Sequence, residues 1–310
     1  MLLNNLLKFL RSPLSSSTDL IDNPTLLSPS MSEIANTKPA TKDLFQKTAQ
    51  IQKNFLTSPA ISLPLKPELT PYEPHRFEHQ FTTSQTSLLL QKCKSMGITI
   101  THAITASIAL SILKVAGIEA GEYTTSLPTS VRDTFPAPYN SPSHAALLAI
   151  TSPLPVIPIT TSTPFLSLAN TVKETYLSWK NDKDTITSHA VQAELFDGLV
   201  KAGVINSSNF AGKATVVMSS LGVVEKYLTI AAEQKDEEET KGEKVGVEDF
   251  WVGQIQGNTK VILFLYTFAG KMRVAACYNR RFHEDDAVRG FVGTVVQRVY
   301  EELGVDSSSL

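Results

Sequence analysis

The C-terminal stretch of the chain shows its clearest hydrophobic pattern. Between residues 288 and 303, apolar side chains recur at intervals of three and four residues, so they line one face of a helix. Glu284, Asp285 and Asp286 come just before or within the first turn, where the helix dipole favours carboxylates. We therefore predict that an amphipathic helix closes the fold.

The middle of the chain alternates between helical and extended patterns. Helices are predicted over 84–97, 101–116, 163–180 and 188–204. Strands are predicted over 75–83, 124–132, 144–156, 213–222, 247–255, 260–268 and 272–279. Ala269-Gly270-Lys271 is typical of a tight hairpin between the last two strands. This order predicts an α/β fold, a mixed sheet with helices packed on one of its faces.

Prolines dominate the sequence before this regular part. Nine of them stand between residues 12 and 74, so long elements cannot form there, except for one helix predicted over 42–55. Recurring Leu, Ile and Phe favour docking on a larger body over the alternative, a disordered linker. We therefore divide the chain into a remnant helix and crossover segment, residues 1–74, and a C-terminal domain, residues 75–310.

The first residues, MLLNNLLKFL, form an apolar helical face with no capping residue in front of it. Asn4 and Asn5 interrupt the apolar core that a secretory signal needs. Two interpretations remain: a basic, amphipathic mitochondrial presequence, or a helix entered after its start. The default location is the cytoplasm, where the distant Cys93 and Cys277 would be reduced, buried thiols.

Composition excludes several classes of protein. The chain is 42% apolar and 19% charged with a net charge of -2, which is typical of a globular domain and not of a nucleic-acid binder. No apolar run is long enough for a membrane span, and no Cys or His spacing predicts a metal site. The charged stretch 233–244 is interpreted as a solvated surface loop.

Candidate chemistry was sought first among the histidines, because histidine is the commonest general base. His102 stands at the start of a buried helix and could face a cleft. The competing interpretation is favoured, in which neighbouring polar groups such as Thr99 satisfy this ring. Phosphate-binding, dinucleotide-binding, nucleophile-elbow and zinc-protease motifs do not occur in the sequence.

Other polar residues stand at the ends of predicted strands. Ser219 and Ser220 could donate hydrogen bonds into a cleft or make a turn, and the two interpretations are equally supported. Arg132 could hold an anion or tie a loop, and a salt bridge is favoured. Asp249 and Phe250 are assigned structural roles, the acid in a turn or ion pair and the ring in the core.

Five stretches resemble, in their order along the chain, the CoA-dependent acyltransferase superfamily. They are KCKSMGITITHAITASIALSIL, TTSLPTSVRD, VVMSSLGVVEKYL, VEDFWVGQI and LYTFAGKMRVAACYNRRF, and the resemblance covers residues 75–303. Ser220 stands where Asn is usual in the S-N-L-G strand end, and VEDFWVGQI is a degraded Asp-Phe-Gly-Trp-Gly motif. The group includes fungal alcohol and trichothecene acetyltransferases and the condensation domains of peptide synthetases.

The resemblance implies a fold like chloramphenicol acetyltransferase, with two similar halves and a tunnel between them. It also implies that a His in an H-x-x-x-D motif deprotonates a small-molecule alcohol, which attacks acyl-CoA, the co-substrate. Ser219, Ser220 and Arg132 would line the tunnel, and Asp249, Phe250 and Gly253 would form the structural motif. No cofactor would be bound permanently.

The H-x-x-x-D motif is absent, because none of the six histidines has Asp four residues later. We therefore expect an acyl-CoA-dependent O-acyltransferase that lacks its first half, with MLLNNLLKFL as the helix that follows the motif in the family. The alternatives are a non-catalytic binding protein, a condensation-like domain, or a complete small enzyme with His102 as base. The missing half would be a potential partner.

Overall fold

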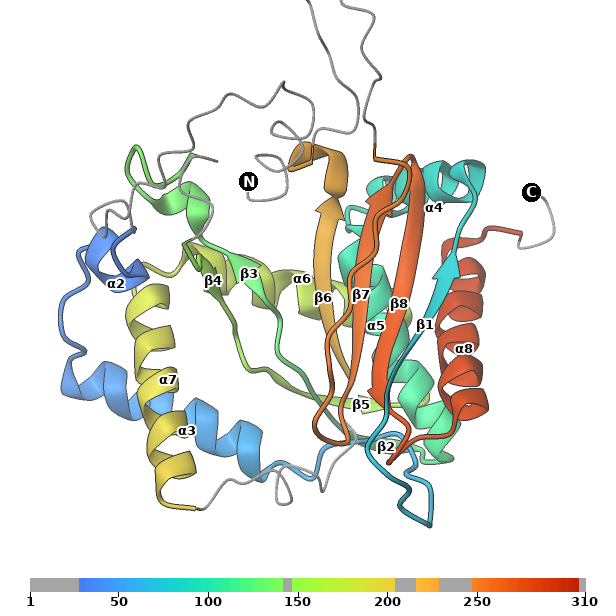
Figure 1. Ribbon diagram of the computed structural model, residues 1–310, viewed down its shortest axis with the longest axis horizontal. Helices are drawn as coiled ribbons and strands as arrows, with labels where there is room; N and C mark the ends of the chain where they lie inside the picture. The colour runs from blue at the N-terminus through green and yellow to red at the C-terminus, as the bar shows by residue number, and fades with distance from the viewer. Residues whose placement is uncertain (1–27, 142–146, 204–215, 229–246, 307–310) are drawn as a thin grey trace, which may run out of the picture.

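The computed structural model describes residues 28–141, 147–203, 216–228 and 247–306 (Figure 1). The predicted N-terminal helix and the charged stretch 233–244 lie outside these residues.

A four-stranded mixed sheet forms the centre of the structure. Its order is β1 (Pro74–Gln80), β8 (Lys271–Asn279), β7 (Val261–Phe268) and β6 (Val216–Val223). The pairs β1–β8 and β8–β7 are antiparallel, whereas β6 and β7 are parallel. Figure 1 shows β6 at one edge of the sheet and β1 at the other. The predicted mixed sheet is confirmed.

The hairpin between β7 and β8 is confirmed at the predicted position. Phe268 pairs with Lys271, which leaves Ala269 and Gly270 as the two-residue turn. Their φ values of 50° and 71° are both positive, as the favoured type of two-residue hairpin turn requires. The turn therefore fixes the register of the two most buried strands.

Three helices cover one face of the sheet: α4 (Thr83–Ser95), α5 (Ile100–Ala116) and α8 (Asp285–Leu303). The apolar face predicted for α8 is buried, and α5 is buried from residue 103 to residue 113. The Thr99 side chain caps the start of α5, and Gly117 ends it in the left-handed conformation. The prediction of helices on one face is thereby confirmed.

The opposite face of the sheet is covered by an irregular segment, residues 247–256. The sequence predicted a strand over 247–255, and this prediction is wrong, because the segment has no strand pairing. Its Val247, Phe250 and Val252 pack against buried side chains on the outer face of β7 and β8. The apolar residues of this segment therefore reflect packing onto a sheet rather than membership of one.

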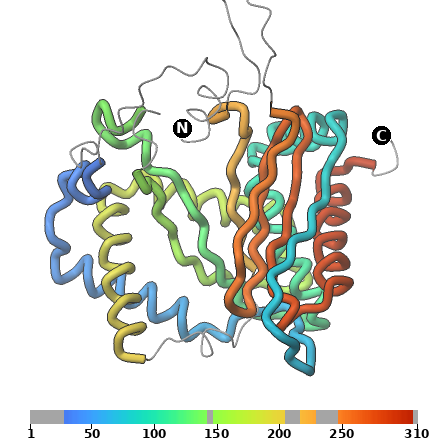
Figure 2. Tube along the Cα trace, viewed as in Figure 1, coloured from blue at the N-terminus to red at the C-terminus, as the bar shows by residue number. Residues whose placement is uncertain are grey.

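Of the remaining elements, some lie beside the edge strand β6 (Figure 2): α2 (Met31–Ile34), α3 (Lys42–Thr57), α7 (Thr185–Lys201) and the two-stranded sheet of β3 (Thr129–Ser130) with β4 (Ile150–Thr151). The others, α6 (Phe165–Asn181) and the two-stranded sheet of β2 (Ala120–Thr124) with β5 (Val156–Thr160), pack against α5 and join the main core. Short 3-10 helices occupy Arg132–Thr134 and Val224–Lys226.

The strands predicted over 124–132 and 144–156 are much shorter in the structure. Regular pairing stops after Thr124, resumes for two residues in β3 and β4, and starts again at Val156. Pro128, Pro153 and Pro155 interrupt these stretches, and proline cannot donate to a strand ladder. Residues 144–146 of the second stretch lie outside the described ranges.

The proline-rich segment docks on the larger body, as predicted. Helix α3 packs against α7, and Ile61 and Leu63 enter the main hydrophobic core. The predicted division of the chain at residue 74 remains a prediction. In the part of the chain that the structure describes, no single helix is long and apolar enough to cross a membrane. Helices α4 and α5 together have the required length and apolar character, but the chain bends by 92° between them.

Candidate functional site

Two hydroxyl groups meet where α5 begins and β6 ends. The Oγ1 atom of Thr101 lies 3.0 Å from the Oγ atom of Ser220, so one of the hydroxyls donates to the other. The ladder between β6 and β7 shifts register between Ser220 and Gly222, and Gly222 has a φ of 71°. A bulge at this position bends the strand and changes the direction of the side chains at its end.

Ser219 and Ser220 do not share a face of the sheet. Side chains alternate along a strand, and Met218, two residues before Ser220, points toward α5, where it contacts the hydroxyl of Thr105. Ser219 therefore points to the opposite side. Of the two serines predicted for the tunnel, the structure brings only Ser220 to the start of α5.

His102 is held as part of the helix cap. The Nδ1 atom of His102 accepts a hydrogen bond of 3.1 Å from the backbone N–H of Thr99. In return, the backbone N–H of His102 donates to the Thr99 hydroxyl. Burial, and to a lesser degree the nearby charge of Lys173, lowers the pKa of His102 to about 4. The imidazole is therefore neutral near pH 7, with its proton on Nε2.

The ring of His102 turns toward α6 rather than toward Ser220. The centroid of its ring lies 5.8 Å from that of the Tyr176 ring on α6. Successive side chains on a helix point about 100° apart, so Thr101, which contacts Ser220, points in a different direction from His102. The interpretation of a helix-start histidine satisfied by local polar groups is confirmed. Its role as a general base remains a prediction.

Arg132 ties a loop. Its guanidinium donates to the backbone oxygen of Tyr139 over 3.2 Å and to that of Leu147 over 2.7 Å. The neighbouring Asp133 forms a salt bridge with Lys180 at 2.6 Å on the surface. The loop-tying interpretation is confirmed for Arg132. The salt bridge favoured for Arg132 and a contact with substrate remain predictions.

The Asp249-Phe250 motif anchors the segment that covers the sheet. Arg273 on β8 reaches Asp249 over 2.6 Å and the backbone oxygen of Phe250 over 3.0 Å. This ion pair lowers the pKa of Asp249. A Cβ atom at Gly253 would lie 3.4 Å from the ring of Trp251, an ordinary van der Waals contact, so the glycine and the indole lie side by side. These contacts support the structural roles predicted for the motif.

A polar network behind this motif was missed by the sequence analysis. Glu78 on β1 accepts a hydrogen bond of 2.6 Å from the hydroxyl of Tyr266 and pairs with both Arg76 and Arg273. Arg76 also donates to the backbone oxygen of Val252 over 2.8 Å. The alternation of charged residues on β1 was the available signal, because Arg76 and Glu78 must share a face.

Metal and thiol chemistry have little support in the described part of the chain. No group of three or more His, Cys, Asp or Glu side chains gathers there in the manner of a metal site. Cys93 and Cys277 are buried and unpaired, as predicted, and burial raises the pKa of Cys93 to about 11. A thiol with such a pKa is a poor nucleophile at neutral pH.

Solved structures share this architecture. The trichothecene 15-O-acetyltransferase TRI3 from Fusarium sporotrichioides matches 85% of this chain and 54% of its own chain, with a TM-score of 0.68 and 16% identity. The EpoB cyclization-docking bidomain from Sorangium cellulosum matches 87% of this chain with a TM-score of 0.53 and 15% identity. The chain thus shares the mixed α/β fold of these structures.

Relatives in sequence point to the superfamily that the five stretches resemble. The O-acetyltransferase pigM of Monascus ruber is 25% identical over 314 residues, which cover 99% of this chain and 59% of the relative. The azaphilone biosynthesis cluster protein M of Aspergillus terreus is 24% identical over 81% of this chain and 59% of its own length. The chain therefore spans about 59% of the length of these relatives. No family model matches it.

Proposed function

We propose that this chain takes part in acyl-CoA-dependent O-acylation, in which an acetyl group passes to an alcohol of a small secondary metabolite. The observation that carries the proposal is the similarity to an O-acetyltransferase along 99% of the chain. The fold shared with TRI3 supports it. The chain would correspond to the C-terminal half of such an enzyme.

The hydroxyl pair of Thr101 and Ser220 is the part of the site that this chain would supply. When one hydroxyl donates to the other over 3.0 Å, the acceptor of that bond keeps a hydrogen for a further partner. A hydroxyl placed in this way can donate to the carbonyl of a thioester or to an amide of the pantetheine arm. Such a bond contributes about 0.5–1.5 kcal/mol.

We further propose that the general base comes from a segment equivalent to the part of the relatives that this chain does not span. None of the six histidines carries the H-x-x-x-D spacing. His102 has its Nδ1 atom engaged by Thr99 and a pKa of about 4, which makes it a poor base near neutral pH. Its ring serves the helix cap instead.

The test is to measure acetyl-CoA binding to the purified 310-residue chain by calorimetry, and CoA release in the presence of a panel of alcohols. Ser220→Ala is expected to weaken binding by roughly threefold to tenfold, because a hydrogen-bond donor is lost. Ser219→Ala is the matched control, since its side chain leaves the opposite face of β6. Equal effects of both substitutions, or no binding at all, would contradict the proposal.

A second candidate function is binding of an acyl thioester without catalysis. The observation that favours it is the absence of the H-x-x-x-D spacing from the sequence. Release of CoA that depends on an alcohol would exclude this second candidate and would also show that a base is present in this chain. Binding of acetyl-CoA without release fits both candidates, because the proposed general base is not in this chain.

A further inference from the structure

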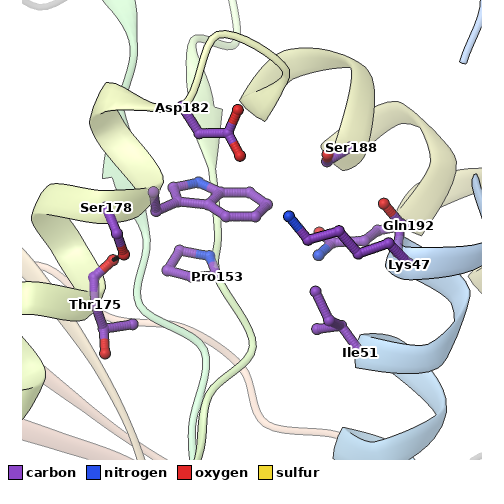
Figure 3. A pocket seen from close by; sticks show the side chains of 10 residues that line it. Lys47, Ile51, Pro153, Thr175, Ser178, Asp182, Ser188 and Gln192 are labelled. Carbon is purple, nitrogen blue, oxygen red and sulfur yellow. Dashed lines mark hydrogen bonds between the residues drawn. The ribbon is translucent and has the colours of Figure 1, made fainter. Parts of the chain in front are cut away.

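A pocket lies between α3, α6 and α7, outside the residues assigned to acyl transfer (Figure 3). Its volume is about 230 Å³. The lining combines a long aliphatic side chain, an indole and several polar groups: Lys47, Thr48, Ile51, Pro153, Thr175, Ser178, Trp179, Asp182, Ser188 and Gln192. The size is suited to a ligand with one aromatic ring and one or two polar substituents.

Gln192 supplies an unused hydrogen-bond donor in this pocket. The residue is only 7% exposed, and its Nε2 atom makes no hydrogen bond of normal geometry among the residues that the structure describes, although its side chain lies near the His189 ring. A buried amide without a partner costs free energy, so a ligand acceptor at this position would recover it. A carboxylate or carbonyl oxygen is the complementary group.

Lys47 gives the pocket a positive charge. Its side chain extends from α3 into the pocket, on the side where the Gln192 and Ser188 side chains lie (Figure 3). It takes part in none of the ion pairs found among the described residues. An anion could therefore pair with this ammonium group without displacing a protein carboxylate.

Asp182 occupies another part of the lining and points into the pocket (Figure 3). Its Oδ1 atom accepts a hydrogen bond of 2.9 Å from the backbone N–H of Asp184, and this bond orients the carboxylate. A carboxylate can only accept hydrogen bonds when ionised, so it calls for a donor such as a hydroxyl on the ligand. One end of the pocket thus favours a hydrogen-bond acceptor on the ligand, and the other end favours a hydrogen-bond donor.

Trp179 provides a flat apolar wall of the pocket. Its Nε1 atom donates to the hydroxyl of Thr151 over 2.9 Å, which fixes the ring in one orientation. The ring is half-buried and lines the pocket. A fixed indole that needs no partner for its N–H favours stacking of a second aromatic ring.

From this arrangement we infer that the pocket between α3, α6 and α7 binds a hydroxylated aromatic carboxylate. The carboxylate lies against Lys47 and Gln192, the ring packs on Trp179, and the hydroxyl donates to Asp182. The site is separate from the acyl-CoA site proposed above, and it requires no acyl transfer.

The two tryptophans of the chain allow a direct measurement of this binding. Trp251 is 67% exposed and lies on the segment that covers the sheet, so Trp251→Phe leaves Trp179 as the only indole. Titration of this variant with 4-hydroxybenzoate is expected to give saturable quenching of its fluorescence. The reciprocal variant, Trp179→Phe, is expected to give none.

Substitution of the polar lining tests the orientation of the ligand. In calorimetric titrations of otherwise unchanged chains with 4-hydroxybenzoate, Lys47→Met and Gln192→Leu are each expected to weaken binding at least about tenfold. Lys53→Met, on the same helix but outside the lining, is the matched control and should bind as the unchanged chain does. The probe 4-hydroxybenzyl alcohol, which has no carboxylate, should bind at least about tenfold more weakly.

Four results would overturn the inference. They are absence of binding, saturable quenching in Trp179→Phe, equal affinities of Lys47→Met and Lys53→Met, and displacement of the probe by acetyl-CoA. The last result would make the pocket part of the acyl-CoA site. Failure of acetyl-CoA to bind, with the probe bound as described, would contradict only the proposed function.

Discussion

At the scale of single residues, His102 shows how one side chain can be taken for chemistry when it serves structure. The sequence offered it as the one histidine able to face a cleft. The structure uses its Nδ1 atom to close a reciprocal cap with Thr99, one of two such bonds at the start of α5. Burial of the ring, and to a lesser degree the nearby charge of Lys173, makes its protonation unfavourable in the folded state.

The pH dependence of stability follows from this protonation. The pKa of His102 is about 4 in the folded state and near 6.5 in the unfolded chain, so the unfolded state binds a proton first as the pH falls. The contribution of the neutral His102 ring to the free energy of unfolding is present above about pH 6.5 and is lost progressively as the pH falls toward 4. Urea unfolding at about pH 6.5 and about pH 4 should give free energies of unfolding that differ by about 2 kcal/mol from this source.

The variant His102→Gln tests the source of this effect. Glutamine at this position of a capping box can still accept from the Thr99 N–H but does not titrate. Its free energy of unfolding should therefore fall less between pH 6.5 and pH 4 than that of the unchanged chain. His79, His189 and His283 also have a lowered pKa from burial, so part of the dependence should remain.

At the scale of elements, the turn between β7 and β8 carries a residue in an unfavourable conformation. Ala269 has a φ of 50°, which is costly for a side chain with Cβ, whereas Gly270 accepts its φ of 71° at no such cost. Ala269→Asn should raise the free energy of unfolding by about 0.5–1 kcal/mol, since Asn-Gly suits this turn. Thermal and urea unfolding measure the change.

The neighbouring position gives the opposite expectation. A Cβ atom at Gly270 would lie 3.3 Å from the Cγ2 atom of Thr83, in addition to the strain of its φ. Gly270→Ala should therefore lower the free energy of unfolding by about 1 kcal/mol. Changes of the same sign in the two variants would show that the turn conformation does not control hairpin stability.

The elements differed in how far the sequence determined them. The helix α8 and the β7–β8 hairpin depend on local periodicity and turn chemistry, so both were predicted where they occur. The segment 247–256 is rich in apolar and aromatic residues like a strand, but whether it pairs or packs depends on space on the outer sheet face, which no local pattern encodes. The strands near Pro128 and Pro153 were predicted too long for a different reason, because the prolines within them prevent continuous pairing.

The candidate site was less predictable than the fold. Ser220 and its neighbour Ser219 look equivalent in sequence, and only the sheet decides that Ser220 faces α5. Thr101 and Glu78 meet their partners across more than a hundred residues of sequence, so their pairings could not be read from spacing. The pocket beside Trp179 depends on three helices and was not anticipated at all.

At the scale of the whole molecule, an ionic cluster joins the sheet to its last helix. Asp285, in the first turn of α8, accepts from the hydroxyl of Tyr278 over 2.7 Å and pairs with Arg280 over 2.5 Å. The Arg280 guanidinium also meets Glu73, at the start of β1. These contacts hold the pKa of Asp285 well below its ordinary value.

Acid should therefore weaken the attachment of α8. A lowered carboxyl pKa contributes stability that is present above about pH 4 and is lost as the pH falls further. Asp285→Asn should lower the free energy of unfolding at pH 7 by about 1–2 kcal/mol and flatten its decline below pH 4. The exposed Asp286 is the matched control in chemical unfolding, and an equal loss in Asp286→Asn would contradict this role for the cluster.

The position of β6 at the sheet edge has a consequence for handling the protein. In the described part of the chain β6 pairs on one side only, so its outer backbone groups are available to template a foreign strand. The bulge after Ser220 breaks the regular spacing of those groups, which limits the stretch that could recruit another chain to residues 216–220. A single bulge in the backbone can thus protect the molecule against polymerisation. A variant in which β6 continued without the bulge would offer a longer regular edge and should be less soluble.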